Sequence, residues 1–530
     1  MSSPYDVVLP SDSPQWAQKL QADFNRSFTG IANDIKAARA ARARFFFPEK
    51  YDNLSATIAA ANTAAADYET GVIVNPAGGD FNLPSTTITG RVAIIGSDNT
   101  ASRINLTSTT GVALDLNGGG QGFHALNNIT FRHTGSDATA TAVKLRNMPS
   151  LVLDNVRLES TYATGVALEN INFIQGASNF IESHQNTALS IAGGSNIIGG
   201  SLEGIFRTDG AAGAANVYGP TVKVAGPLSG FKLLGKLGGA GPRLRLTINV
   251  IASDASGFIA ACTTPHGLVV GETFIIHGTS NANYNGYWKI GAVINTTDIK
   301  VVSTVVNFGA SAGGVLTTDF AGLLITNEAG SVNECDWSSL IYEAINPLVT
   351  DKYLVGSWAV LVDASRNAGN TIYNQNFESR IFDLGFSNLR IIGNVDGSGY
   401  ALAHTISAGG AFVTAERSIQ LEGGVDNVTI NAANVYGQSG IGGSRWSANA
   451  ACVYAIAKAG RGPKGIIISG SQLGRGVSGN GFPRAIVFDG AGSGDVVING
   501  SIVRGSTTPI DYVNGATALA VNPTISGVLN

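Results

Sequence analysis

The chain has 530 residues, 13% of which are charged, and a formal net charge of −4 at pH 7. Such a sparsely charged, slightly acidic chain has no basic footprint for nucleic acid or an anionic membrane, and no apolar run is long enough to cross a bilayer. Its 68 glycines come with only 16 prolines and no Gly-X-Y period, which excludes collagen. We therefore expect neither nucleic acid nor a membrane among its partners.

The N-terminus and the cysteines indicate where the chain is made. The opening residues MSSPYDVV have neither the basic nor the apolar segment of a secretory signal peptide. Cys262, Cys335 and Cys452 are odd in number and far apart, which predicts neither a disulfide framework nor a zinc motif. We expect synthesis in a reducing cytoplasm, inert packed thiols, and no metal or other cofactor.

The first 48 residues carry a helical pattern that differs from everything after them. Ser13 is a suitable N-cap and Pro14 sits at the first helical position. Apolar residues then recur every three or four positions through about residue 42, and from Phe28 onward the intervals alternate as in a coiled coil. We interpret 1–48 as a helical anchor that holds a homotrimer together through Trp16, Leu20, Phe24, Phe28, Ile31 and Ile35. The alternative is a single amphipathic helix packed on the domain that follows.

Residues 49–242 read as a short helix followed by stacked strands. The segment 54–66 (LSATIAAANTAAA) predicts a helix, which would cover the open end of the stack and its exposed strand edge. Short phrases of alternating β-branched residues then recur, and Val143, Val166 and Leu189 follow one another at steps of 23 residues. Such steps predict a solenoid whose coils bury their apolar sides only against their neighbours. Because the spacing varies, the favoured fold is a right-handed parallel β-helix.

The pattern changes over 243–319 and then returns. Four apolar runs there are separated by turn signals, among them Asn285-Gly286, which between apolar runs indicates a hairpin. We predict a small antiparallel β-barrel inserted into one coil. Coil phrases resume over 320–505 as the second part of the β-helix, and 506–530 form a polar C-terminal tail rich in Ala and Gly.

The coil phrases NVRLES at 155–160 and GSNIIGGSLE at 194–203, preceded by the two helices, resemble phage tail spikes and tail fibres of the pectate-lyase-like β-helix type. The segment 265–290 is similar to small β-barrel modules that recur in phage tail proteins. The resemblance implies a homotrimer located in the virion, docked through its N-terminus on a tail, baseplate or adaptor protein, with a bacterial surface glycan as target. The chain departs from that family in its very short anchor and in lacking an obvious C-terminal chaperone segment.

Four glutamates share one phrase and are the candidate catalytic residues. Glu159, Glu182 and Glu203 follow one another at steps of 23 and 21 residues, and Glu378 repeats the phrase beyond the insert. If the positions are equivalent, neighbouring carboxylates stack about 5 Å apart and alternate ones about 10 Å apart. These separations bracket those of retaining and inverting glycoside hydrolysis, and repulsion would raise the pKa of one carboxyl into a proton donor. The alternative is a solvated or glycan-binding face.

Aromatic residues in the second half are the candidate glycan-binding residues, because flat rings stack on sugar faces. The six candidates are Tyr342, Trp358, Tyr373, Tyr400, Tyr436 and Trp446. The alternative role for these rings is packing between subunits.

The sequence therefore predicts an all-β tail spike or tail fibre that binds bacterial surface polysaccharide as its host receptor. The first alternative is that the same β-helix is also a polysaccharide depolymerase, either a glycosidase using the glutamates or a lyase with Lys144 or Arg146 as its base. The second is a secreted pectin-type lyase, against which the missing signal peptide argues.

Overall fold

The structure is a computed structural model. The residues it describes are 43–48, 53–66, 70–75, 80–97, 99–100, 102–120, 123–135, 137, 139–160, 163–184, 186–192, 197–208, 220–238, 245–268, 270, 273–277, 279–281, 284, 286–302, 309–318, 320–343, 357–381, 385–393, 401–402, 404–407, 411–437, 451–458, 460–474, 484–492, 495–504, 508–517 and 525–526. The six predicted trimerisation residues, Tyr400 and Trp446 lie outside these ranges.

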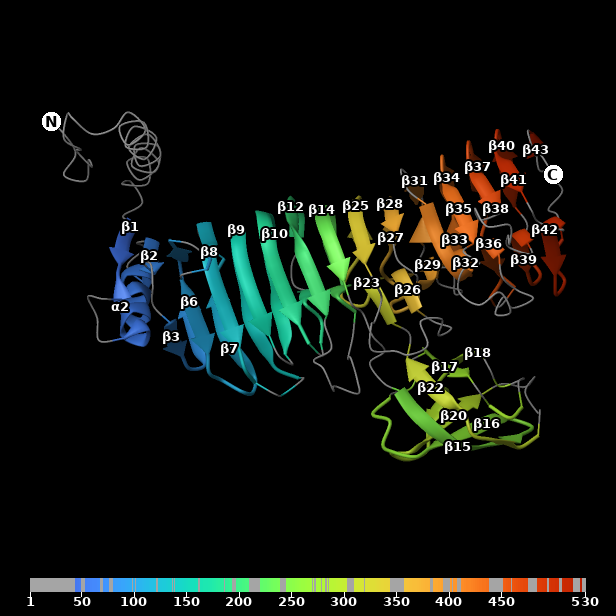
Figure 1. The fold of residues 1–530 in the computed structure, drawn as a ribbon, viewed down its shortest axis with the longest axis horizontal. Coiled ribbons are helices and arrows are strands. Elements are labelled where there is room, and N and C mark those ends of the chain that lie inside the picture. The colour runs from blue at the N-terminus through green and yellow to red at the C-terminus, as the bar shows by residue number, and fades with distance from the viewer. Residues whose placement is uncertain are drawn as a thin grey trace.

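Most of the described strands belong to one parallel sheet that winds into a β-helix, so the predicted fold class is confirmed. Figure 1 shows its coils stacked into a rod, from β1 at one end to β43 at the other. The elements before the insert are β1 (Ala43–Phe46), α2 (Leu54–Ala66), β2 (Thr70–Asn75), β3 (Asp80–Leu83), β4 (Thr86–Thr89), β5 (Val92–Gly96), β6 (Arg103–Leu106), β7 (Val112–Asn117), β8 (Phe123–His133), β9 (Thr141–Ser160), β10 (Thr164–Ser183), β11 (Leu189–Ala192), β12 (Ile197–Thr208), β13 (Val222–Val224) and β14 (Leu228–Gly238).

The β-helix continues after the insert with strands that pair in parallel with the earlier coils. Its strands there are β23 (Phe320–Thr326), β24 (Val332–Asn333), β25 (Asp336–Glu343), β26 (Ser357–Asp363), β27 (Ile372–Tyr373), β28 (Asn376–Ile381), β29 (Gly385–Ile392), β30 (Ala401–Leu402), β31 (Thr405–Ser407), β32 (Ala411–Glu422), β33 (Val425–Asp426), β34 (Thr429–Asn431), β35 (Asn434–Gly437), β36 (Ala451–Ile456), β37 (Ile466–Ser469), β38 (Gln472–Gly474), β39 (Arg484–Asp489), β40 (Val496–Asn499), β41 (Ile502–Arg504), β42 (Thr508–Val513) and β43 (Ile525–Ser526).

The N-terminal end of the rod is covered by α2, as the sequence predicts. Asn53 caps this helix, because its side-chain oxygen accepts the backbone N–H of Ala56 at 2.8 Å. Leu54 and Ile58 of the helix are buried in the same core as the coils. The helical anchor predicted over 1–48 is wrong at its end, because Ala43–Phe46 form β1 and pair in parallel with β2. Pairing with the sheet gives these backbone groups partners that an isolated helix end lacks.

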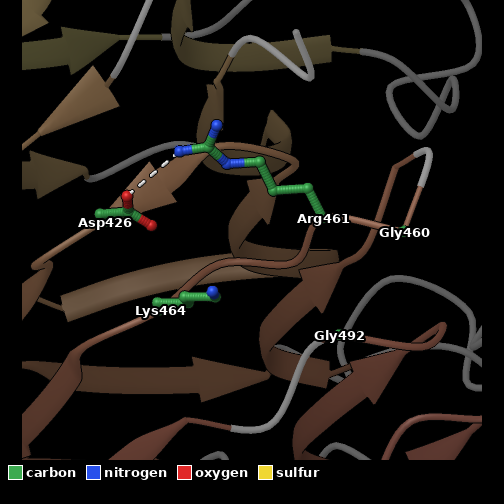
Figure 2. Close-up of a pocket in the computed structure, with 5 residues that line it drawn as sticks. All are labelled: Asp426, Gly460, Arg461, Lys464 and Gly492. Atoms are coloured by element: carbon green, nitrogen blue, oxygen red, sulfur yellow. Dashed lines mark hydrogen bonds and ion pairs between the residues drawn. The ribbon is translucent and has the colours of Figure 1, made fainter. Parts of the chain in front are cut away.

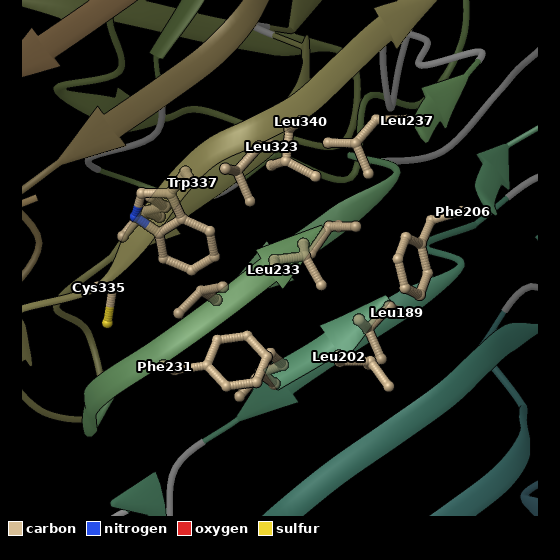
Figure 3. Packing of buried hydrophobic residues seen from close by; sticks show 14 of the residues in the cluster. Leu189, Leu202, Phe206, Phe231, Leu233, Leu237, Leu323, Cys335, Trp337 and Leu340 are labelled. Carbon is tan, nitrogen blue, oxygen red and sulfur yellow. The ribbon is translucent and has the colours of Figure 1, made fainter. Parts of the chain in front are cut away.

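The core is a column of aliphatic side chains stacked one coil above the next. β9, β10 and β11 align Leu145, Leu168 and Ile191 in register, and all three are buried. Figure 3 shows the column near the middle of the rod, where Phe231 and Trp337 meet edge to face with centroids 6.1 Å apart. Each fully buried aliphatic side chain contributes roughly 1.5–3 kcal/mol to folding. Burial also raises the pKa of the Cys335 thiol to about 12, so this thiol stays protonated.

Recurring asparagines turn the corners of the coils within the long strands β8, β9 and β10. Asn128, Asn155, Asn147 and Asn170 have positive φ angles, a conformation that asparagine tolerates better than most residues. Asparagines at equivalent corners also bond to one another, since the Asn155 amide donates to Asn128 and the Asn170 amide donates to Asn147, both at 2.7 Å. The phrase that marks the repeat in the sequence therefore has a specific backbone role.

The insert forms a second, antiparallel sheet with its own core. Its strands are β15 (Arg245–Asp254), β16 (Gly257–Cys262), β17 (Thr273–His277), β18 (Gly286–Lys289), β19 (Ala292–Val293), β20 (Asp298–Val302), β21 (Ser311–Ala312) and β22 (Val315–Thr318). β15 pairs with β22 along its first residues and with β16 and β21 further on. The core is centred on Phe258, against which Tyr284 and Trp288 pack edge to face. Figure 1 shows this module on the flank of the rod.

Replacing the module, residues 245–318, by a short Gly/Ser linker should leave the β-helix folded. The reason is that the module has a separate core and, among the described strands, no pairing joins its sheet to the larger one. We expect the β-sheet circular dichroism signal and the main thermal transition of the rod to persist. As a control, Leu168→Asp places a charge in the coil core and should prevent folding. A shortened chain that is unfolded or aggregated would contradict the independence of the two sheets.

Candidate functional site

Two of the four candidate glutamates are neighbours, and cations flank them. The register of β9 and β10 places Glu182 beside Glu159, one strand spacing away. On the far sides, Arg132 is in register with Glu159 and Arg207 with Glu182. The two oxygens of Glu159 are held by Arg132 at 3.2 Å and by Arg157 at 2.8 Å. This row of charges compensates the two stacked carboxylates, whose mutual repulsion would otherwise oppose folding.

The predicted ladder of three glutamates is wrong at Glu203. The coil advances 25 residues from Glu182 to its partner Arg207 (207 − 182), so Glu203 is four residues short of that position and is in register with Leu234. The step from β10 to β12 is 26 residues at Gly176 and 25 residues at Asn179, beyond a bulge, whereas the step from β9 to β10 is 23 residues at Glu159; the longer coil, and not the bulge, displaces Glu203. The buried Asn179 side chain fixes the bulge by donating to the carbonyls of Leu153 and Glu203 and accepting the N–H of Val156.

Glu378 lies in β28, in register with Ser407, several coils beyond the other three glutamates. Its side chain belongs to the part of the chain that the structure does not describe. Its proposed catalytic role remains a prediction.

The candidate aromatic residues divide by burial, and two of them must be corrected. Tyr342 and Trp358 are buried, with 3% and 0% of their surface exposed, so neither ring is open to a sugar. Tyr342 belongs to the coil core, where burial raises its pKa. Trp358 packs against Ala321 and Leu361 and under the guanidinium of Arg390, 5.5 Å from the ring centroid. The sequence could not distinguish an outward aromatic residue from a covered one.

Tyr373 is half-buried and keeps its hydroxyl near the surface, where it donates to Glu334 at 2.7 Å. This bond raises the tyrosine pKa. Tyr436 lies in β35, but its side chain is not among those described. Tyr373 thus remains a candidate for glycan contact, and the other three aromatic residues remain predictions.

A buried polar cluster on β29 and β32 was not predicted. Arg390, Gln420 and Glu422 stand at outward positions of the coils, yet each is at most 4% exposed. Arg390 donates to Glu422 at 2.6 Å, Gln420 donates to the same oxygen, and the Lys458 ammonium lies 3.7 Å from the other. Burial alone would raise the pKa of Glu422, but Arg390, Lys458 and these hydrogen bonds outweigh it and lower the pKa to about 2. Glu422 is therefore a fixed anion and not a proton donor.

Lys458 also begins a loop that forms a pocket on the outside of the rod. The backbones of Lys458 and Arg461 bond to each other in both directions, at 2.8 and 3.0 Å. The loop rejoins the coil at Lys464, whose backbone bridges to Asp426. Figure 2 shows the resulting pocket of about 380 Å³, lined by Asp426, Gly460, Arg461, Lys464 and Gly492.

Two glycines shape the rim of this pocket. Gly460 and Gly492 have φ angles of +76° and +92°, which disfavour any other residue. A Cβ on Gly492 would meet the carbonyl oxygen of Gly460 at 2.6 Å, so a side chain there would push the loop outward. The backbones of the two turns can approach closely because residue 492 is glycine, whereas a Cβ on Gly460 would meet nothing within 4 Å.

The charges of the pocket are unequal. One carboxylate, Asp426, faces two cations, and its Oδ2 is held by Arg461 at 3.4 Å while its Oδ1 is buried. The ammonium of Lys464 is exposed and forms no ion pair with a residue that the structure describes. Asp495 accepts the N–H of Gly465 at 2.9 Å and does not line the pocket. The accessible charge is therefore positive.

Two kinds of site are absent from the described ranges. No group of three or more His, Cys, Asp or Glu side chains there could hold a metal ion. No helix there has the length and apolar character to cross a bilayer.

Comparisons with known proteins find structural likeness only. No protein-family model matches the sequence, and no curated protein is detectably related to it. The surface adhesin PfbA of Streptococcus pneumoniae matches 88% of this chain and 100% of its own, at 9% identity and a TM-score of 0.39. An α-1,3-glucanase of Streptomyces thermodiastaticus matches 87% and 68%, at 11% identity and 0.37. The Dettilon tailspike protein matches 88% and 68%, at 10% identity and 0.35. Likenesses this distant identify no ligand or activity for this chain.

Glu422→Gln should destabilise the protein at neutral pH by roughly 3 kcal/mol, because it leaves Arg390 buried without its counter-ion. Since the folded pKa of Glu422 is lowered to about 2 from 4.5, its stabilising effect is complete above pH 4.5 and is lost as the pH falls toward 2. Urea unfolding at pH 7 and pH 3 should show the difference between the two proteins shrinking.

Glu159→Gln is the matched control, since Glu159 is partly exposed and its ion pairs contribute less than about 1 kcal/mol each. An equal loss of stability in both variants would contradict the distinct role of the Glu422 cluster.

Proposed function

We propose that this protein is a phage tail spike that binds polysaccharide on the bacterial surface and attaches the virion to its host. The observation that carries the proposal is the pocket on the outside of the rod, whose lining consists of Asp426, Arg461, Lys464 and two glycines. Sites for small apolar ligands are lined mainly by apolar side chains. A lining of charged groups and backbone suits a ligand rich in hydroxyl and charged substituents, which describes a polysaccharide.

The shape of the protein supports the same proposal. Coils stacked at the strand spacing of about 4.8 Å present equivalent surface positions repeatedly along the rod. A linear polysaccharide likewise presents the same substituents at regular intervals. Weak contacts that recur along both partners add up, and three rods in one homotrimer would raise the apparent affinity by a further factor of roughly 10²–10⁴.

The depolymerase alternative depends on Glu159 and Glu182, whose backbones are in register on adjacent strands about one strand spacing apart, a spacing near the carboxyl separation used by retaining glycosidases. Such an enzyme needs one protonated carboxyl as its acid. Both carboxylate oxygens of Glu159 are instead engaged by Arg132 and Arg157, and Arg207 is in register with Glu182. Adhesion without cleavage is therefore the function that this geometry favours.

Full-length protein should bind a subset of polysaccharides on an array of purified bacterial surface glycans. Heat-denatured protein serves as the control, because binding must depend on the folded rod. Light scattering of the same sample should give the mass of three chains. Failure to bind any glycan on a broad array would refute the proposed receptor function, and a monomer would refute the trimer.

The bound polysaccharide should keep its chain length during prolonged incubation with the protein. Cleavage is measured by new reducing ends and by loss of viscosity. If the polymer is cleaved and both Glu159→Gln and Glu182→Gln abolish cleavage while binding is kept, the protein is a hydrolase, because an amide cannot supply the proton or act as the nucleophile.

A further inference from the structure

The pocket at Lys464 combines a positive charge with a rigid frame, on a chain whose net charge is −4. Ion pairs elsewhere on the rod compensate basic side chains, as Glu169 does for Lys144 at 2.8 Å and Glu328 for Lys223 at 2.7 Å. Lys464 has no such partner among the described residues. An uncompensated ammonium beside a pocket is the feature that needs a functional explanation.

We propose that this pocket binds an anionic substituent of the polysaccharide, so that the receptor is an acidic glycan. The inference rests on the proposed function and names the chemical class of its ligand. A lysine ammonium recognises a carboxylate or a phosphate as a point charge, through charge-assisted hydrogen bonds. Both a uronic acid and a phosphate-bearing sugar present that chemistry.

The geometry leaves Lys464 as the recognition group. Figure 2 shows its side chain extending toward the space between Arg461 and Gly492. Arg461 is engaged with Asp426, and that ion pair ties the loop to β33 while reducing the negative charge at the pocket surface. Asp426, the one carboxylate among the lining residues, therefore does not prevent an anion from entering the pocket.

The frame around Lys464 is organised before any ligand arrives. Lys458 at the start of the loop lies 3.7 Å from Glu422, whose own charge is fixed by Arg390 in the buried cluster. The backbone of Lys464 donates to the carbonyl of Val425 at 2.9 Å and accepts the N–H of Asn427 at 2.8 Å. A site held in this way loses little conformational entropy when it binds, which increases its affinity.

Gly460 leaves room for the sugar itself. An added Cβ there would meet nothing within 4 Å, so a pyranose that brings its charged group to Lys464 can lie against this backbone with no side chain in between. Both lining glycines have positive φ angles, which disfavour a side chain at either position.

The test is the glycan array, probed with full-length wild-type protein and three variants, at low and at high salt. The array carries polysaccharides with uronic acids, polysaccharides with phosphate, and neutral polysaccharides. We expect binding to the acidic members, weakened at high salt, with Lys464→Gln reducing the affinity roughly fivefold to tenfold because the ammonium is exposed. Which acidic members bind distinguishes a carboxylate from a phosphate.

Two controls separate the local charge from folding and from general electrostatics. Lys464→Arg keeps the charge and should retain most of the binding. Lys300→Gln removes one charge from the inserted module, away from the pocket, and should leave binding unchanged. The melting temperatures of the two Lys464 variants should match that of the wild type, since Lys464 is exposed.

The results of this experiment separate the acidic specificity of the pocket from the receptor function of the protein. Binding to neutral glycans that is insensitive to Lys464→Gln would overturn the acidic specificity while the receptor function stands. A loss of binding in Lys300→Gln equal to that in Lys464→Gln would also overturn it, since attraction would then follow net charge and not the pocket. Absence of binding to every glycan would refute both proposals.

Discussion

In-register stacking of parallel coils is the constraint on which the rest of this structure depends. Each coil is too thin to enclose a core, so it buries its aliphatic side chains only against the coils above and below. Leu145, Leu168 and Ile191 illustrate the consequence, since a shift of one residue in any strand would turn its apolar side chain outward. Backbone pairing thus fixes the place of every side chain on the rod, including those of the candidate sites.

Corners and loops are free to vary because the stacked strands hold the register. Asparagines with positive φ angles turn the chain at the corners of the coils, and the loop between two strands can then have any length. One such connection holds the antiparallel module, and another forms the short loop from Lys458 to Lys464. Features with functional potential therefore lie where a coil departs from its regular course, as is usual for loops on rigid scaffolds.

The sequence predicted the repeated elements well, because coils that repeat in the structure require a repeated pattern of residues. The coil phrases, the helix over 54–66 and the antiparallel insert all follow from local patterns of apolar and turn residues. The length of an individual coil cannot be read from these patterns, and for this reason Glu203 could not be told apart from Glu159 and Glu182. Whether an outward-facing side chain is buried, as Trp358 is, depends on which residues cover that face, and this also could not be predicted from the sequence. The pocket was missed because its lining comes from three separate segments, at 426, 460–464 and 492.

Stacking also imposes an electrostatic rule that bears on function. A charge at one coil position lies about 5 Å from the same position on the next coil, and two like charges there repel by about 3 kcal/mol at an effective dielectric constant of 20. The rod offsets this repulsion with arginines on the outer sides of the pair Glu159 and Glu182 and with Arg390 beside Glu422. Paired in this way, the carboxylates neutralise the surface locally, and Glu422 is held ionised, which suits a structural role better than proton transfer. A charge that the stack leaves uncompensated, as at Lys464, is then the position where a ligand of opposite sign gains most by binding.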